Sequence, residues 1–571
     1  MQHFLLRIEA QNLSSFIFDN DDLSTVRGAG MILLNVFRLL TGQPDGSNSA
    51  SVGLFKPKKN DADPVKKYSW NHEGVDIQLS EVSVGASICV LDFKATTDQA
   101  SALAKEIREW LSNHELLKHA TFSVAFQEIT DGFRNSNERL LAKVRNLQMR
   151  QLSLVPPDIQ HSKEARFCDI DAIRPGTVDL NAEKASDTQS AFAKASDKNW
   201  VSQSSSVRRA YGRNAKVRIY GLVGEEQDSK APFVPTWTFE ELARRGKWRM
   251  DHVDDDDPYA KLDGKMAVLY FDGNAFGRLQ ANKVKELSDQ RKFDQAVRDY
   301  RRGLMKALIQ KIKSEPRWQV KPDAKVARQF ANRDGRALPY QGRLETLMWG
   351  GDELVWVLPA WCGFEAVNFF YEFSSGWEFA GQKLTHAGGL VFCSHKSPIR
   401  EVVTLAKELA EGVKARLVEI HHRAEPTSKT SDADVPYQST SNAFAYQVLE
   451  SFDSLGSDIE QARADRRFNQ LDASDEVLTA TSLKEIEVHI RSLKEKDFSQ
   501  GRLYEIVRQI RSAPDELQTL FNRIVATNTA IAHSDLNDLV VGKTDAETKA
   551  SVFVSQAAKW HHLVEAWNYV S

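Results

Sequence analysis

The sequence has few cysteines, no long apolar run and almost no net charge. The four cysteines among 571 residues are far apart: Cys89, Cys168, Cys362 and Cys393. Their spacing excludes a disulfide scaffold and a zinc ribbon built from C-x-x-C pairs, and it is typical of a reducing compartment. The apolar start of the chain is broken by Arg7 and Glu9, so it is not a signal peptide, and no run approaches the ~18 residues of a membrane span. We therefore expect a cytoplasmic protein without membrane contact.

The opposite charges nearly cancel. The chain has 75 Lys and Arg against 78 Asp and Glu, a net charge of −3, with 42% hydrophobic and 27% charged residues. This composition is that of a globular protein and excludes a disordered chain, a collagen and a uniformly basic nucleic-acid binder. The length is enough for three or four domains of about 150 residues.

Residues 1–150 alternate between strand-like and helix-like patterns. Apolar runs predict strands, and apolar positions at helical spacing predict helices. The predicted strands cover 3–10, 85–95 and 120–129, and the predicted helices cover 25–42 and 102–114. This order predicts an N-terminal α+β domain with an antiparallel or mixed sheet. Residues 151–258 have a weaker pattern and are expected to form a connector or small subdomain.

A second α+β unit is predicted over residues 259–425. A strand, a glycine-containing loop and a helix start follow one another over 265–280, and two apolar runs surround Gly350 and Gly351 as in a hairpin. Another strand is predicted at 385–395 and a periodic helix at 400–423. Helical patterns dominate residues 443–571, which predicts a helical C-terminal domain.

The main candidate for chemistry is a set of carboxylates in this second unit. Asp272 ends an apolar strand, and Asp352 and Glu353 lie at the predicted hairpin tip. If these strands are neighbours, the carboxylates converge, as one or two Mg²⁺ (or Mn²⁺) ions would need for acting on a 3′-hydroxyl and a leaving pyrophosphate. Asp352 and Glu353 are adjacent and would face opposite sides of a regular strand, so one of them could be structural, and Asp352 is the stronger candidate ligand.

Two glycine-containing segments accompany these carboxylates. The loop after the first strand leads into a helix, so its backbone N–H groups could hold a triphosphate. This loop consists of Gly273, Asn274, Ala275, Phe276 and Gly277. Gly350 and Gly351 permit a tight turn with positive φ and leave space where a nucleotide must approach.

The motifs resemble the palm domain shared by GGDEF-type diguanylate cyclases, class III nucleotidyl cyclases and the large polymerase–cyclase subunit of type III CRISPR effector complexes. The last is the most similar, with a strand ending in D-G-D-N-x-G, a G-G-D-D hairpin and a later H-K-x-P-I before a helix that carries a lysine. This chain has YFDGNAFG, WGGDE and HKSPI, with Lys414 on the following helix. An N-terminal helix opening R-G-A-S in that family is matched by RGAG at 27–30. The resemblance covers most of residues 1–425.

The resemblance implies two ferredoxin-like palms, of which the second is catalytic and the first helps to hold a second nucleotide. It implies that ATP is joined into cyclic or linear oligoadenylates, second messengers of antiviral defence. The implied metal ligands are Asp272, Asp352 and Glu353, with the Phe271 carbonyl completing the shell, and Lys414 would bind phosphate.

The chain also departs from that family. Glu353 replaces the second aspartate of the hairpin, and Asn274 replaces the second aspartate of the loop. The family's zinc-binding cysteines between the palms are missing, and only Cys168 lies there. The palm-like pattern begins at residue 4, so we expect no HD nuclease domain and no DNase activity.

A basic segment separates the two carboxylate motifs. Residues 283–343 hold 17 Lys and Arg against seven Asp and Glu, a net charge of +10. Among these cations are Arg291, Arg301, Arg302, Lys311, Arg328 and Arg333. Such a segment could contact RNA or nucleotide phosphates, or it could be a helix whose charged side faces solvent.

Three functions therefore remain open. The first is a nucleotidyltransferase that acts on ATP, the second is a GTP-using enzyme similar to diguanylate cyclases, and the third is a non-enzymatic scaffold that binds nucleotide or RNA. The expected partners are a nucleoside triphosphate and either CRISPR effector subunits or a second copy of the chain.

Overall fold

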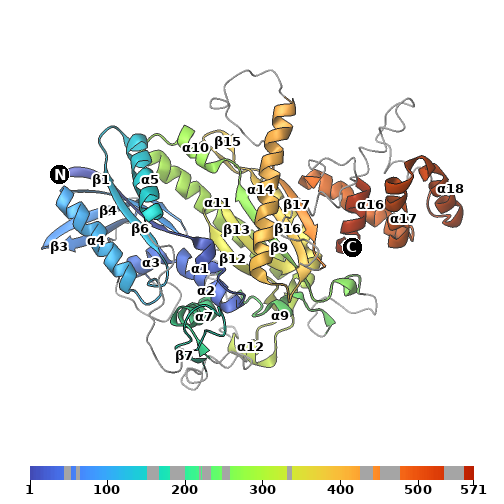
Figure 1. The fold of residues 1–571 in the computed structure, drawn as a ribbon, viewed down its shortest axis with the longest axis horizontal. Helices are drawn as coiled ribbons and strands as arrows, with labels where there is room; N and C mark the ends of the chain where they lie inside the picture. The colour runs from blue at the N-terminus through green and yellow to red at the C-terminus, as the bar shows by residue number, and fades with distance from the viewer. Residues whose placement is uncertain are drawn as a thin grey trace.

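The computed structural model describes residues 1–43, 53–58, 65–85, 87–150, 166–180, 200–217, 220, 233–246, 257–330, 337–424, 441–450, 476–532 and 559–570. Figure 1 shows two sheet-containing units beside each other, with a group of helices at the carboxyl-terminal side. None of the helices in these ranges has the length and hydrophobicity that a membrane crossing requires.

The first sheet has six strands in the order β2-β3-β4-β5-β1-β6, and its neighbouring strands are antiparallel. The strands are β1 (Gln2–Ala10), β2 (Lys56–Lys58), β3 (Lys67–His72), β4 (Val75–Val84), β5 (Ile88–Ala95) and β6 (Phe122–Glu128). The helices of this unit are α1 (Leu13–Ile17), α2 (Leu23–Leu34), α3 (Val36–Leu40), α4 (Thr97–Asn113) and α5 (Phe133–Arg150). The order β4-β5-β1-β6, with helices after β1 and β5, is ferredoxin-like.

The second sheet has five strands in the order β12-β13-β9-β16-β17. The strands are β9 (Lys265–Gly273), β12 (Glu345–Gly350), β13 (Glu353–Pro359), β16 (His386–Ser394) and β17 (Ala443–Val448). The first four again have the ferredoxin-like order, and β9 pairs antiparallel with both β13 and β16. The main helices are α10 (Phe276–Lys283), α11 (Leu287–Ser314), α13 (Gly363–Ser374) and α14 (Ile399–Ala424). The predicted α+β class with two ferredoxin-like units is confirmed.

The longer remaining elements are α7 (Gln203–Asn214) of the connector and the C-terminal helices. Those helices are α16 (Ala480–Glu495), α17 (Gln500–Ser512) and α18 (Leu517–Thr527). The short helices are α9 (Phe239–Ala243) and α12 (Ala324–Gln329), and the short strands are β10 (Gln319–Val320), β11 (Gln341–Gly342), β14 (Glu378–Phe379) and β15 (Gln382–Lys383). The polar sequence AEPTSKTSDADVPYQSTSN, which begins at residue 424 and predicts a linker, lies mostly outside the described residues.

Two predicted elements differ from the structure. The prediction of only helices after residue 443 is wrong for β17, which pairs parallel with β16 and extends the second sheet. The single helix predicted over 25–42 divides at Asn35 into α2 and α3. The Asn35 amide donates to the Met31 carbonyl and to the Tyr211 hydroxyl, both at 3.1 Å, so a contact with a distant residue holds the break.

Helix α2 joins the two units because glycines let its backbone approach both neighbours (Figure 1). A Cβ atom added at Gly28 would lie 1.7 Å from the Arg208 carbonyl oxygen of α7 (Gln203–Asn214), a helix of the connector. One added at Gly30 would lie 2.5 Å from the Leu347 carbonyl oxygen of β12. Any larger residue would therefore force these backbones apart. The RGAG segment packs the first unit against the strand that leads to the Gly350–Gly351 hairpin.

A buried ion cluster lies at the same junction. Arg27 Nε donates to Glu345 Oε1 at 2.7 Å, and Lys216 Nζ donates to Glu345 Oε2 at 2.9 Å. The three residues are at most 2% exposed and come from α2, the end of the connector and β12. The cluster links three chain segments at one carboxylate.

Candidate active site

The structure brings the two carboxylate motifs together at one end of the second sheet. Phe271 of β9 pairs with Leu354 of β13, so Glu353 lies opposite Asp272 at the end of this ladder. The Gly273 N–H donates to the Asp352 carbonyl at 3.1 Å, which fixes the hairpin beside the end of β9. Motifs 80 residues apart in sequence are therefore adjacent in space.

Lys414 of α14 binds the first carboxylate. Its Nζ lies 2.6 Å from Asp272 Oδ2 and donates to the Gly273 carbonyl at 3.1 Å. Burial raises the pKa of Asp272 to about 6; Lys414 opposes this rise, and the charges of Asp352 and Glu353 add to it. One lysine thus compensates only part of the negative charge at this edge.

The two hairpin carboxylates have different surroundings. Tyr270 and Asp272 face the same side of β9, and the Tyr270 hydroxyl donates to Glu353 Oε1 at 2.7 Å. Glu353 therefore shares a face with Asp272. Asp352 lies in the turn against Gly273, where burial and the charge of Glu353 raise its pKa and Arg301 opposes the rise.

The sequence analysis placed Arg301 in the basic segment and missed its position at the site. Arg301 is 4% exposed, and its Nη1 donates to the Glu353 carbonyl at 3.0 Å. Its guanidinium lies over the Trp349 ring at 5.7 Å, and its Nη2 has no hydrogen-bond partner among the described residues. Burial lowers its pKa to about 10, against the raising effect of the three carboxylates. Arg301 therefore positions the hairpin backbone with one N–H group and keeps another unpaired beside it.

The predicted phosphate loop forms the turn from β9 into α10. A Cβ atom at Gly273 would lie 2.6 Å from the Phe276 ring and 2.8 Å from the Asp352 side chain, so only glycine fits there. Ala275 has a left-handed φ of 56° and begins α10 without a side-chain cap, which leaves the first N–H groups of the helix without that partner. The position of Gly277 faces open space. Asn274 anchors the loop to the chain before β16. Its backbone N–H donates to the Thr385 carbonyl at 2.8 Å, and its side-chain amide donates to the Thr385 hydroxyl at 3.1 Å.

The two predicted hairpin glycines differ in conformation. Gly351 has a φ of 50°, as expected for the turn, whereas Gly350 pairs with Glu353 within the ladder and does not have a positive φ. Both glycines line a cavity of about 230 Å³ between the two units. The cavity has aromatic walls at Phe37, Tyr68 and Trp349. It also has five basic residues, Arg38, Lys66, Arg298, Arg301 and Arg302, against the acidic residues Glu81 and Asp294. Its excess of positive charge and its aromatic rings suit an anionic ligand with a flat ring.

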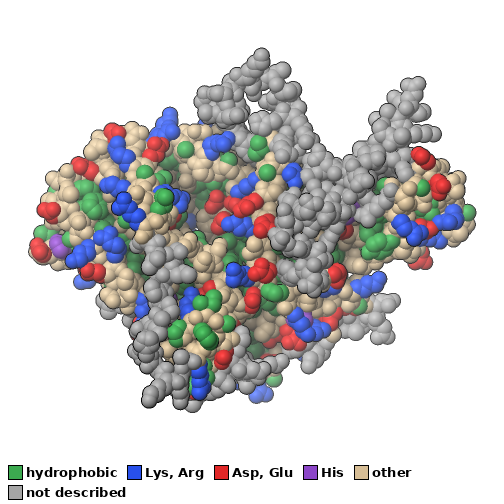
Figure 2. Space-filling model, viewed as in Figure 1, with side chains coloured by type: hydrophobic (Ala, Val, Ile, Leu, Met, Phe, Trp, Pro, Cys, Tyr) green, Lys and Arg blue, Asp and Glu red, His purple; other side chains and the backbone are tan. Residues whose placement is uncertain are grey.

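The basic segment does not present all its cations as one surface. Arg291 binds Asp92 at 2.5 Å, and Lys311 binds Glu365 at 2.6 Å. The buried Arg343 donates to backbone carbonyls, among them that of Leu242 at 2.6 Å. Figure 2 shows basic and acidic side chains interspersed over the visible face. Arg328 lies on α12, Arg333 lies outside the described residues, and RNA contact through this segment stays a prediction.

The carboxylates at this sheet edge are few, but their number and placement fit Mg²⁺. Within the described ranges, no three His, Cys, Asp or Glu side chains are grouped as a metal site would require. Mg²⁺ is nevertheless commonly held by one or two carboxylates with water and substrate phosphates. Asp272 and Glu353 lie on one face, and burial, with a smaller effect of the neighbouring carboxylates, raises the pKa of Asp272, so a bound cation would stabilise its ionised form. The ring of Phe271 stacks on Phe370 at 4.0 Å and its backbone lies between two paired strands, so a ligand role for its carbonyl stays a prediction.

Comparisons with known proteins found similar solved structures. No family model and no curated protein matches the sequence. A Csm1–Csm4 cassette in complex with one ATP is 12% identical with a TM-score of 0.48, over 100% of this chain and 70% of that chain. Csm1 of T. onnurineus is 13% identical with a TM-score of 0.48, over the same shares. An apo type III-B Cmr-beta structure is 10% identical with a TM-score of 0.46, over 99% of this chain and 82% of that chain.

Proposed function

We propose that this protein is a Mg²⁺-dependent nucleotidyltransferase that makes cyclic or linear oligonucleotides, with ATP as substrate, as an effector of CRISPR-type antiviral defence. The observation that carries the proposal is the meeting of Asp272 and the GGDE hairpin at one sheet edge, beside Lys414 and a basic cavity. The choice of ATP and the defence role rest on the resemblance of the motifs.

Each residue has a defined task in this proposal. Asp272 and Glu353, with Asp352 beside them, would hold Mg²⁺, which supplies charge neutralisation for phosphoryl transfer when it is bound. Lys414 contacts phosphate oxygens, and the uncapped N–H groups of α10 receive the triphosphate. Arg301 holds the hairpin in place through the Glu353 carbonyl. Catalysis would then consist mainly of positioning and charge stabilisation.

The test is a product assay with the purified full chain. The protein is incubated with Mg²⁺ or Mn²⁺ and each nucleoside triphosphate, with and without guide and target RNA, and pyrophosphate and product masses are measured. Oligoadenylates support the proposal, and cyclic diguanylate would support the GTP-using alternative. Nucleotide binding without any phosphodiester product would support the scaffold.

Substitution of Lys414 tests the phosphate contact. Loss of a charge-assisted hydrogen bond costs about 1.5–3 kcal/mol, so Lys414→Gln is expected to lower kcat/KM roughly 10- to 100-fold. Lys407→Gln is the matched control, because Lys407 lies on the same helix and, among the described residues, makes an exposed contact with Glu411 at 3.9 Å. Equal activities of the two variants would show that Lys414 does not contact the phosphate.

Metal binding should depend on pH through Asp272. A carboxyl group must be ionised to bind a cation, and the pKa of Asp272 is about 6. Mn²⁺ affinity measured by electron paramagnetic resonance, without nucleotide, is therefore expected to be constant above about pH 7 and to fall roughly tenfold per pH unit below 6. An affinity unchanged down to pH 4.5 would show that Asp272 is not a ligand.

A further inference from the structure

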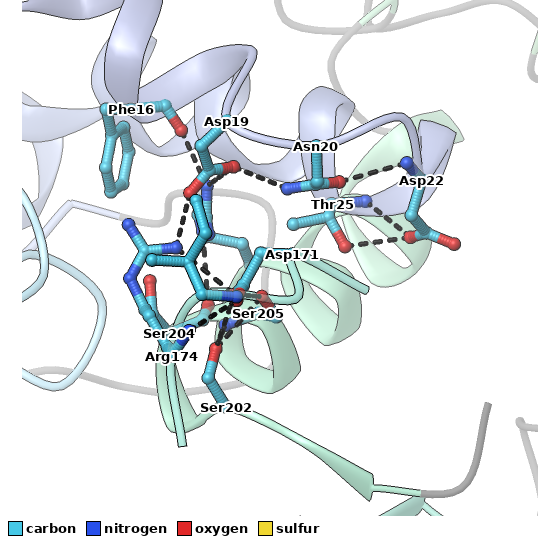
Figure 3. A network of polar contacts seen from close by, with 12 residues as sticks. Phe16, Asp19, Asn20, Asp22, Thr25, Asp171, Arg174, Ser202, Ser204 and Ser205 are labelled. Carbon is cyan, nitrogen blue, oxygen red and sulfur yellow. Dashed lines mark hydrogen bonds and ion pairs between the residues drawn. The ribbon is translucent and has the colours of Figure 1, made fainter. Parts of the chain in front are cut away.

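Four side chains of the connector meet in a pattern of two pairs. Cys168 and Asp171 form one pair, and Ser202 and Ser205 form the other, with two residues between the members of each pair. Asp171 Oδ2 accepts hydrogen bonds from Ser202 Oγ at 3.1 Å and Ser205 Oγ at 3.0 Å, and Cys168 Sγ lies 3.9 Å from Ser205 Oγ. Figure 3 shows the side chains of Asp171, Ser202 and Ser205 gathered in one network of hydrogen bonds. All four residues are at most 7% exposed.

The first pair lies in a tight loop. The Cys168 N–H donates to the Arg174 carbonyl at 2.8 Å, and the Ile170 N–H donates to Cys168 Sγ at 3.4 Å. Ala172, directly after Asp171, has a left-handed φ of 54°, a conformation that favours glycine. The loop thus turns both side chains of the pair inward.

The second pair lies at the start of a helix. Strands β7 (Val178–Asp179) and β8 (Trp200–Val201) pair antiparallel and lead from the loop to α7. Ser202 caps α7 by accepting from the Ser205 N–H at 3.1 Å, so both hydroxyls face the loop. A loop pair and a helix pair, each spaced by two residues and converging on one point, is the arrangement in which four cysteines bind structural zinc.

The residues present do not fit zinc. Only Cys168 is a strong zinc ligand, because serine hydroxyls are not among the usual ones and Asp171 is already occupied. Asp171 Oδ1 accepts from the backbone N–H groups of Ile173 and Arg174, at 3.0 and 2.8 Å, and Oδ2 lies 3.2 Å from Arg174 Nη1. Burial alone would raise the pKa of Asp171, but these hydrogen bonds and Ser205 lower it to about 2. The carboxylate is therefore ionised and fully bonded without a metal.

The same network attaches the connector to the first unit. Arg174 Nη1 also binds Asp19 Oδ2 at 2.6 Å (Figure 3). Arg208 of α7 binds Asp19 at 2.8 Å through both terminal nitrogens. Since α7 packs on α2 at Gly28, the four-residue cluster supports the helix that joins the two units. Loss of this cluster would therefore change how the two units are held relative to each other.

We propose that the connector is a four-position zinc knuckle in which hydrogen bonds centred on Asp171 have replaced the metal. The wild-type connector then assembles without zinc, and its backbone keeps the tetrahedral arrangement of ligand positions. Three substitutions, Asp171→Cys, Ser202→Cys and Ser205→Cys, should restore a site with four thiolates, including that of Cys168. This inference does not depend on the proposed nucleotidyltransferase activity.

The experiment compares zinc and cobalt binding by the full-length wild type and the triple variant. The variant, produced with zinc, is expected to retain about one equivalent more zinc per chain than the wild type and, with Co²⁺, to show the visible absorption of tetrahedral thiolate coordination. Chelation is expected to lower the melting temperature of the variant and leave that of the wild type unchanged.

The control moves one thiol out of the cluster. In a variant with Asp169→Cys, Asp171→Ala, Ser202→Cys and Ser205→Cys, the number of cysteines is the same and the Asp171 carboxylate is also lost, but residue 169 points to the Trp200 N–H, which its carboxylate binds at 2.9 Å. This variant should lack the tetrahedral spectrum. Three results would overturn the proposal: equal spectra for the two variants, a triple variant that stays unfolded in zinc, or stoichiometric zinc in the wild type that Cys168→Ser removes.

Discussion

Asp272→Asn is expected to abolish nucleotide transfer while making the metal-free protein more stable. The variant loses a proposed metal ligand, and since a bound metal supplies several kcal/mol of charge stabilisation, activity should fall by roughly 100-fold or more. In the absence of metal, the ionised Asp272 carboxylate destabilises the folded state, because folding raises the pKa of this group from 3.8 to about 6. Removing that charge should stabilise the folded state by roughly 3 kcal/mol above pH 6.

The sign of the pH dependence provides the check. A carboxyl group with a raised pKa binds more protons in the folded state, so its destabilising effect develops as the pH rises from about 4 to about 6. The stability difference between Asp272→Asn and the wild type should therefore vanish near pH 4 and be largest at neutral pH. Denaturant unfolding at several pH values, with EDTA, measures this difference.

Glu450→Gln is the matched control for that experiment. Glu450 pairs with Lys265 at the opposite end of β9, at 2.8 Å, and its side chain is 75% exposed. Its loss should change the stability by less than about 1 kcal/mol and leave activity intact. A destabilised Asp272→Asn variant would show that Lys414 already compensates the charge of Asp272, and active Asp272→Asn protein would contradict its role as a metal ligand.

The sequence predicted the elements whose pattern is local. Strands β9, β13 and β16 are largely apolar runs because the sheet buries them, and these runs predicted an α+β unit around the carboxylate motifs. The ferredoxin-like form of that unit was predicted from the resemblance of the motifs. Strand β17 was missed because helical patterns dominate the sequence after it, and the strand forms by pairing with β16, from which α14 separates it in the chain. Strand β4 was missed because only apolar runs were counted as strands, although its alternation of apolar and polar residues is the pattern of a half-buried strand.

The site was predicted less completely than the fold. The sequence analysis identified Asp272 and the hairpin, but not that Glu353 shares a face with Asp272, because the face depends on the ladder register. Arg301 was grouped with surface cations, although it lies on the buried side of α11, one turn before Leu304 and Met305 and two turns before Leu308. The apolar period of that helix was the signal that could have identified it.

The second large effect is expected at the junction of the two units. Glu345 compensates two buried cations, Arg27 and Lys216, and Lys216 also donates to the Thr236 carbonyl. Glu345→Ala leaves both cations buried without their carboxylate, which typically costs about 3–5 kcal/mol. Because Glu345 begins the strand that ends at Gly350, activity should fall together with stability. Denaturant unfolding and the product assay measure the two effects.

Replacing the whole cluster separates charge from packing. In the triple variant Arg27→Met, Lys216→Met and Glu345→Leu, no buried charge is left unpaired, and apolar replacements of buried ion clusters are often neutral or stabilising. Stability should therefore recover most of the loss seen in Glu345→Ala. If stability recovers and activity does not, the ion cluster sets the angle between α2 and β12, and hence the position of the hairpin relative to the first unit. If Glu345→Ala is as stable as the wild type, water must reach the Arg27 and Lys216 side chains. The junction would then be more open than the exposure of at most 2% for these residues indicates.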